Sequence, residues 1–596
     1  MISDMKKIII PILLGFAMLA VSCEKNLDIP QKAVVSTLEF YSNDDDARAA
    51  LANMYAQYTE NVAGTPGIYV PELMILNYSS DDVYAAGKNF DDHGDFRGFD
   101  EFKYDPANPA LKELYNRYYY AIYHANLIIS NFTTENRNAE EPKFHSKFTD
   151  QCVAEARVMR AYLHMMAAMI WNQPIVMDRI YEADEELPVN TEKTQSEILK
   201  WVVDECQKAI ASGSLPVRNG TGDKNSTARM SLGFAQFIAG KAAVYNNDME
   251  TARKYLGDLI ASKNYALVPS EEFWTNFHIA GDGSPEKIFE PNFLEDPNFT
   301  NNAWGSGAPI QRGRWMVANV FCWRTDALGS QPKVHDGFQG WNGGAIAPAF
   351  AEKFLAHDGN GPRRRACFLT ADEWLYEMDW TSDVNDGTLA QKKADPKRGI
   401  ASANGVFSHG PYFEWKHMVY INPPKILTGG KAFPADNVSG LGPASNQKNF
   451  NVARYAEALL LYAEACEATG DAATGKKYLN MIQARAGVPE TECTFENIVE
   501  EKQYEMWFES CRFLDLVRWS NAGKINMAQQ FAGLHENAVT VFDAFFTKGE
   551  AEHRLYTEHC DLKFNAFSDK YKYLPFPRDY KTANPNLHDV GGWATN

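Results

Sequence analysis

The residue types that support catalysis are present in this chain, but not at the spacings that catalysis requires. The sequence has no GxSxG nucleophile elbow, no HExxH zinc helix and no GxxxxGK[ST] phosphate loop. His553 and His559 are six positions apart, which does not place them on one helical face. There is no CxxC and no Cys/His pair at zinc spacing. We therefore expect that the protein is not an enzyme and has no cofactor.

Two acidic turns offer oxygen ligands of the kind that calcium prefers. They are Asp91-Asp92-His93 and Asp358-Gly359-Asn360-Gly361, and neither follows the EF-hand spacing. Solvated turns explain them better, and a structural calcium ion stays open. Carboxylate pairs for glycoside hydrolysis cannot be assigned from an acidic sequence, because only their separation in space decides that chemistry.

Tryptophans in irregular segments give a stronger indication of binding. Eight of the thirteen tryptophans fall within residues 274–415, where glycine and arginine are interleaved with them. Sugars present flat C–H faces and rings of hydroxyls, so a sugar site needs aromatic planes beside polar side chains. For any one of these tryptophans, packing in the core explains its presence equally well. We predict a glycan platform drawn from this segment and from an earlier loop, comprising Tyr84, Asn89, Trp304, Trp315, Trp323 and Trp341.

The N-terminus has the composition of a secretory signal peptide. Lys6 and Lys7 precede an apolar run over Ile8–Val21, which is too short to span a bilayer comfortably. Cys23 follows small residues and resembles the acylated cysteine of a bacterial lipobox, although Ala20 stands where leucine is usual. We expect lipidation at Cys23 and anchoring to a membrane. The alternative is a secreted soluble protein in which this cysteine is incidental.

Composition limits the partners. The formal net charge of −19 argues against nucleic acid, because phosphate binding needs a face of lysine and arginine. It also argues against a broad electrostatic hold on anionic lipid. The nine cysteines are scattered and mostly lie in apolar helical patterns, so we expect buried free thiols rather than a disulfide framework.

Apolar residues recur every three or four positions in two parts of the chain, which predicts packed helices there. The stretch from about 265 to 450 is instead rich in Gly, Pro, Asn and Trp. The expected helices are 44–55, 110–132, 150–171, 197–211, 228–245, 250–261, 349–356, 452–470, 473–486, 495–510 and 512–521. We expect a signal peptide at 1–22 and a lipid anchor and tether at 23–40. An N-terminal helical region at 41–270, a loop-rich ligand-binding region at 271–449 and a C-terminal helical region at 450–596 would follow.

A similarity between two segments of the chain indicates an internal repeat. Residues 247–256 align with residues 470–479, and each segment follows a helix of small residues and contains a Tyr-Leu pair. A small-residue helix, a tight turn and a second helix resemble a tetratricopeptide unit. We prefer repeats to two unrelated hairpins, and we expect a mainly α fold with tetratricopeptide-like repeats and a large irregular, loop-rich insertion.

The C-terminal third resembles the SusD/RagB family. Arg454–Ala465 looks like its RYAE-hydrophobic-YAEA helix, Glu500–Trp519 like its ER..E…fEg.R..DL.RW segment, and Asn584–Leu587 like its closing NPnL. Glu155–Val176 resembles its upstream motif. Ser510 stands where the family usually has glycine. These motifs are scaffold, and Arg512 and Asp515 could pair at i,i+3.

The resemblance implies a role that composition alone does not. It implies a lipid-anchored protein exposed at the cell outer membrane, which captures an oligosaccharide and delivers it to a SusC-like TonB-dependent transporter. The ligand region would be an aromatic arc. Two alternatives remain: a peptide-binding RagB-like transport partner, which needs an open strand edge or a charged cleft, and a surface glycosidase, which needs two carboxylates at hydrolytic separation.

Overall fold

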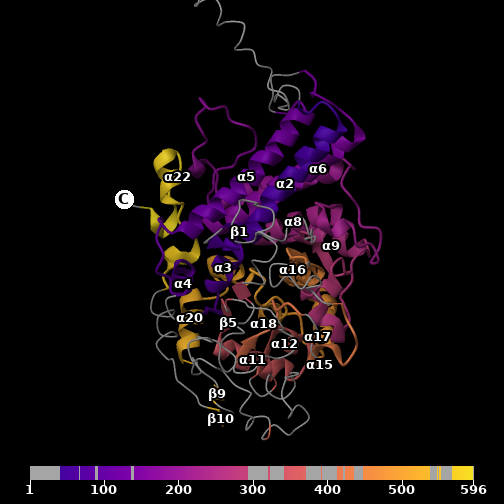
Figure 1. The fold of residues 1–596 in the computed structure, drawn as a ribbon, viewed down its shortest axis with the longest axis vertical. Helices are drawn as coiled ribbons and strands as arrows, with labels where there is room; N and C mark the ends of the chain where they lie inside the picture. The colour runs from indigo at the N-terminus through magenta and orange to yellow at the C-terminus, as the bar shows by residue number, and fades with distance from the viewer. Residues whose placement is uncertain are drawn as a thin grey trace, which may run out of the picture.

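The computed structural model is dominated by helices, with short two-stranded ladders between them (Figure 1). It describes residues 40–65, 68–87, 92–135, 140–292, 320–321, 341, 343–370, 373, 391, 412–420, 423, 425–434, 448–536, 546–547, 550–551 and 567–594.

Helices from both halves of the chain form one continuous row. Each helix of the row packs on the next, and α9 packs directly on α16 although the whole loop-rich region separates them in sequence. Figure 1 shows the row running from the indigo helix α2 to the orange helix α17. The row consists of α2 (Asp44–Ala63), α5 (Pro109–Phe132), α6 (Lys147–Trp171), α7 (Gln195–Ala211), α8 (Leu232–Tyr245), α9 (Met249–Ala261), α16 (Tyr455–Ala468) and α17 (Ala472–Ala486).

The two segments that echo each other in sequence fold as equivalent hairpins. Asn247 turns α8 into α9 and Gly470 turns α16 into α17, both with a left-handed backbone at φ of 57° and 82°. The next residues, Asp248 and Asp471, accept hydrogen bonds from the third N–H of each second helix and so cap it. The mainly α, tetratricopeptide-like fold predicted from the sequence is confirmed.

Shorter elements connect and cover this row. Antiparallel pairs join β3 (Val83–Ala85) to β5 (Gly344–Ile346), β4 (Lys287–Phe289) to β8 (Ala453–Arg454), and β6 (Phe368–Thr370) to β7 (Tyr412–Glu414). The β4–β8 ladder holds together the two ends of residues 290–452. The other short helices are α3 (Pro71–Tyr78), α4 (Gly94–Asp100), α11 (Pro348–Asp358), α12 (Pro362–Cys367), α15 (Lys425–Thr428), α18 (Phe495–Glu505), α19 (Arg512–Asn521), α20 (Met527–Glu536), α22 (Arg578–Ala583) and the 3₁₀ segment η3 (Ser270–Phe277).

A buried charge network ties the loop-rich region to the C-terminal helices. The side chain of Arg454 is 0% exposed and donates to Glu505 at 3.1 Å and Glu509 at 2.7 Å, while also contacting Glu286. Guanidinium groups suit such a site because their donors form a planar fork. The prediction that Arg454 belongs to the scaffold is confirmed. The network comprises Arg363, Lys416, Arg454, Arg485, Glu286, Asp358, Glu501, Glu505 and Glu509.

The pairing suggested for Arg512 and Asp515 is wrong. Arg512 instead donates to both carboxylate oxygens of Asp81, each at 2.7 Å. Asp515 pairs with Lys502 and with Arg518, each at 2.8 Å. The bidentate geometry that Asp81 offers is not available from a carboxylate three residues along the same helix.

Helix α18 ends at Glu505, before its predicted end at 510. Phe508 and Ser510 adopt left-handed backbones with φ of 60° and 63°, which stop the helix. The conformation at Ser510 explains why glycine is usual there. Asn77 secures this turn, because its Oδ1 accepts from the Ser510 N–H at 3.1 Å and its Nδ2 donates to the Ser510 hydroxyl at 3.2 Å.

The cysteines within the described residues are buried and free, as predicted. They are Cys152, Cys206, Cys367, Cys466, Cys493 and Cys511. None of the helices in the described ranges is long and apolar enough to cross a membrane. Cys23 lies outside the described residues.

Candidate functional site

The β3–β5 ladder brings together the two regions that the sequence singled out. Strand β3 lies within the early loop region, which extends from Tyr78 to Phe90, and β5 follows Trp341, so both regions contribute to the same ladder. Tyr84 pairs with Ala345, and the N–H of Ala86 donates to the carbonyl of Gly343 at 3.1 Å. The prediction drew one binding surface from these regions, and the ladder makes them neighbours.

Two glycines allow this close approach. A Cβ on Gly344 would lie 2.4 Å from the Phe508 ring, and a Cβ on Gly343 would lie 2.9 Å from the carbonyl oxygen of Val320. Such distances exclude any side chain without a shift of the neighbours. The Tyr78 hydroxyl also donates to the Gly343 carbonyl. The Gly343–Gly344 pair therefore holds the backbone that follows Trp341 close to Phe508, Val320 and Tyr78.

Trp341 is partly buried and lies beside His93. Their ring centroids are 6.0 Å apart at an interplanar angle of 38°. The His93 side chain is 12% exposed, and its Nε2 has no hydrogen-bond partner among the described residues. Burial lowers the pKa of His93, so the ring is neutral near pH 7 and offers one donor and one acceptor. An indole face beside such an imidazole suits a sugar ring with hydroxyls at its edge.

A buried acid pair anchors the loop beneath this surface. Asp81 and Asp82 are each 1% exposed. Asp81 pairs with Arg512 and accepts from Gln530 at 2.8 Å, while the Asp82 carbonyl accepts from the Trp507 indole at 3.1 Å. Both acids thus hold the loop to the C-terminal helices.

The two carboxyl groups have different protonation behaviour. Burial, followed by the neighbouring Asp81 charge, raises the pKa of Asp82 to about 6. Burial also acts to raise the pKa of Asp81, but the Arg512 guanidinium outweighs this and holds that pKa low. The Asp81–Arg512 pair is therefore charged near pH 7.

The predicted platform residues have different outcomes. Trp341 lies at the meeting point of the two regions. Tyr84 is only 2% exposed and belongs to the core cluster, so its ring is not presented to solvent in this conformation. A three-residue strand with both faces buried explains this position. The other predicted residues lie outside the described residues: Asn89, Trp304, Trp315 and Trp323.

Sequence reasoning treated His93 only as part of an acidic turn and did not predict it beside the tryptophan. Its left-handed backbone, with φ of 53° directly before α4, carries no distinctive sequence signal. At the other acidic turn, Asp358 is committed to Arg363 at 2.8 Å. Within the described ranges, no group of three or more His, Cys, Asp and Glu side chains is arranged to hold a metal ion.

The comparisons with known proteins agree on one family. The SusD family model matches residues 426–593. A SusD-like protein of Bacteroides ovatus is 20% identical over 494 residues, covering 80% of this chain and 76% of the relative. The segment from 426 to 593 is therefore similar to the SusD/RagB family, and the relative extends this similarity over most of the chain.

Solved structures of SusD-like proteins share the fold over most of this chain. A laminarin-binding SusD-like protein superposes with a TM-score of 0.65 at 18% identity, covering 93% of this chain and 100% of that one. A surface glycan-binding protein A of Bacteroides thetaiotaomicron, solved with laminarihexaose, gives 0.66 at 21% identity, covering 91% and 98%. The likeness therefore extends well beyond the C-terminal segment matched by the family model.

Proposed function

We propose that this SusD-like protein is a surface-exposed outer-membrane lipoprotein that binds an oligosaccharide and delivers it to a SusC-like TonB-dependent transporter. Its role is binding and not catalysis. The observation that carries the proposal is the β3–β5 ladder, which joins the early loop to the segment ending at Trp341. The family supports the class of ligand, because the similar solved proteins are named for laminarin and glycan binding.

The proposed platform includes Trp341, with His93 beside it. Trp304, Trp315, Trp323 and Asn89 extend it in this proposal. Their contributions rest on sequence alone. Tyr84 would support the ladder from below, because it is buried there.

We expect Trp341→Ala to weaken glycan binding about tenfold or more, because a stacked aromatic contact is worth roughly 1 to 3 kcal/mol by analogy with base stacking. Calorimetry against a panel of polysaccharides first identifies the ligand of the unmodified protein. The dissociation constant of the Trp341→Ala protein is then measured for that ligand. The matched control is Trp201→Ala, which removes a partly buried tryptophan from α7 and should leave affinity unchanged.

Melting temperature separates a binding role from packing. A buried tryptophan replaced by alanine costs about 3 to 5 kcal/mol of stability. If Trp341→Ala loses stability in step with affinity, the residue is core and the platform lies elsewhere. The same measurements apply to Trp304, Trp315 and Trp323.

Purified protein should release no new reducing ends from any ligand that it binds, whereas cleavage abolished by one carboxylate substitution would favour a glycosidase.

We expect Cys23→Ala to release a folded protein from the outer-membrane fraction, because one lipidated residue would provide the whole attachment. Fractionation should compare the variant with Cys560→Ala, which changes a cysteine distant from the signal peptide. The cells must lack the partner transporter, which could otherwise retain the protein. Retention of Cys23→Ala at the level of the unmodified protein would refute the lipid anchor.

A further inference from the structure

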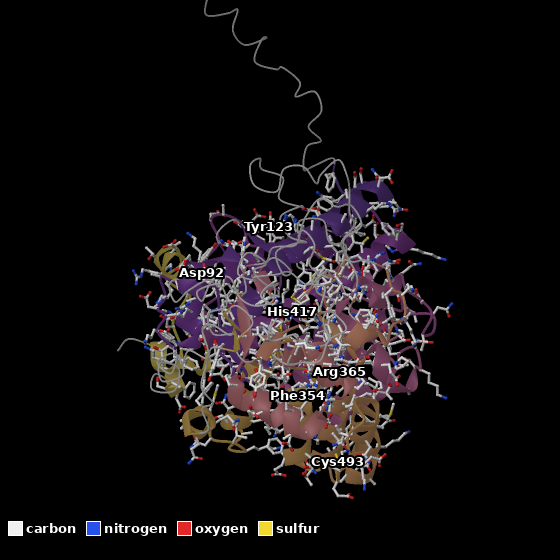
Figure 2. All side chains as sticks on the ribbon, turned by 60° about the horizontal axis from the view of Figure 1, so that its bottom comes forward. Asp92, Tyr123, Phe354, Arg365, His417 and Cys493 are labelled. Atoms are coloured by element: carbon white, nitrogen blue, oxygen red, sulfur yellow. The ribbon has the colours of Figure 1, made fainter. Side chains whose placement is uncertain are left out.

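A cavity lies between η3, α12 and α15, apart from the β3–β5 ladder. It has a volume of about 190 Å³, which suits one sugar residue rather than a chain. Figure 2 labels Arg365, which lines this cavity, well away from Asp92, which neighbours His93 and the candidate platform. The cavity is therefore a separate place on the molecule.

Three consecutive arginines on α12 differ in what they contact. Arg363 is committed to Asp358, Glu501 and Glu505 in the buried charge network. Arg364 donates to Glu373 and to Asn360. Arg365 is only partly buried, and within the described part of the chain no hydrogen bond or ion pair engages its guanidinium. Arg363 and Arg364 each pair with at least one carboxylate, whereas Arg365, which lines the cavity, pairs with none among the described residues.

A second donor in the same cavity also lacks an acceptor. Trp274 is 4% exposed, and its indole Nε1–H has no hydrogen-bond partner among the described residues. A buried donor without an acceptor destabilises the fold, so such groups call for an explanation. The neighbouring lysines, Lys425 and Lys431, add positive charge at the exposed rim.

The rest of the lining suits a sugar. Glu271 and Glu272 offer carboxylate oxygens that accept from hydroxyl groups, and Leu427 and Phe433 offer apolar contact to C–H faces. Three cations against two carboxylates leave the lining with a net positive charge in a strongly acidic protein. Guanidinium binds carboxylates through two parallel hydrogen bonds.

We propose that this cavity binds an acidic sugar residue, with the uronate carboxylate on Arg365 and the ring hydroxyls on the flanking glutamates. The site is independent of the proposed glycan platform at Trp341. It would let the protein hold an acidic side group or end group of a glycan at a second point.

Saturation-transfer NMR on the purified full chain tests the site, using sodium glucuronate as the probe. Glucuronate should receive saturation, whereas glucose and acetate, which lack the charge or the ring, should receive little. Glucose 6-sulfate tests whether a tetrahedral anion can replace the carboxylate. Arg365→Gln should weaken glucuronate binding at least tenfold without lowering the melting temperature, because Arg365 has no partner to lose. Arg578→Gln, at an arginine with a 63% exposed side chain, is the matched control.

Equal binding of glucuronate to the Arg365→Gln protein, or no glucuronate binding at all, would overturn the proposal. Equal binding of acetate or glucose would also overturn the assignment to acidic sugars. Equal binding of glucose 6-sulfate would instead support an anionic-sugar site that accepts either group. The Trp341→Ala protein should still bind glucuronate, so failure of the platform and failure of this cavity give distinguishable results.

Discussion

Arg454→Met should destabilise the protein by about 3 to 5 kcal/mol, the range for removing one partner from a buried ion pair. The substitution leaves Glu286, Glu505 and Glu509 with one cation fewer in a region that excludes water. Methionine fills much of the volume, so the loss reports charge rather than a cavity. Arg454→Lys should also destabilise, because an ammonium group cannot reproduce the planar fork. Urea denaturation followed by circular dichroism measures the effect.

The control is Arg578→Met, at an exposed arginine whose nearest carboxylate, on Asp105, is 3.6 Å away. Exposed pairs of this kind contribute about 0 to 1 kcal/mol. A loss at Arg454 no larger than the loss at Arg578 would mean that the buried charge network does not stabilise the fold.

Acidification should destabilise the protein in two stages, the first between about pH 6.5 and 4. The His164 Nδ1–H donates to the Arg160 carbonyl at 2.8 Å, and Nε2 accepts from the Met177 N–H at 3.0 Å. Protonation of Nε2 would remove this acceptor and place two N–H donors against each other. Burial, above all, lowers the pKa of His164 from 6.5 to about 4. The unfolded chain therefore takes up its proton first as pH falls, which costs the fold about 3 kcal/mol at about 1.4 kcal/mol per pKa unit.

The second stage lies below about pH 4.5 and involves the buried carboxylates. Burial acts to raise the pKa of Glu509, but Arg454 and Lys416 outweigh it and lower that pKa from 4.5 to about 2. Glu205 behaves in the same way beside Arg160. A depressed pKa means that the stabilisation is complete above pH 4.5 and is lost as pH falls through the folded value. Asp82 has the opposite sign, because its raised pKa favours the fold upon protonation, and it offsets part of the first stage.

Denaturation midpoints at about pH 7, 5 and 3 measure both stages. Repeating the series in about 0.5 M NaCl provides the control, because salt screens exposed charges far more than buried ones. The decline should persist in salt. The Asp82→Asn protein removes the offsetting carboxyl group, so in that variant a midpoint that stays constant between pH 7 and 4 would show that His164 is not held neutral.

The helical frame could be predicted from the sequence because its signals are local. Apolar spacing predicted helices such as α6 and α17, and the Gly470-Asp471 turn indicated the hairpin that the structure contains. Each signal lies within about twenty residues, roughly the length of one helix. The sequence of such a hairpin is therefore sufficient to predict it without knowledge of its distant contacts.

The site could be predicted only as a pair of regions. Which side chains meet there depends on contacts such as Arg512–Asp81 and Trp507–Asp82, whose partners are 431 and 425 residues apart in sequence. No local pattern records such pairs. Tyr84 shows the same limit: with Val83, Tyr84 and Ala85 all buried, β3 has no alternation to distinguish an inward ring from an outward one.

The β4–β8 ladder gives the loop-rich region the form of a cassette. Its entry at Phe289 and its exit at Ala453 lie side by side, so a cassette from a relative could be grafted there without breaking the row of helices. The buried charge network sets the condition for such an exchange. A transplanted cassette must bring counterparts of Arg363 and Lys416, because the resident Glu501, Glu505 and Glu509 would otherwise be left short of positive charge. An exchanged segment is therefore constrained at these two cations, whatever the sequence of its loops.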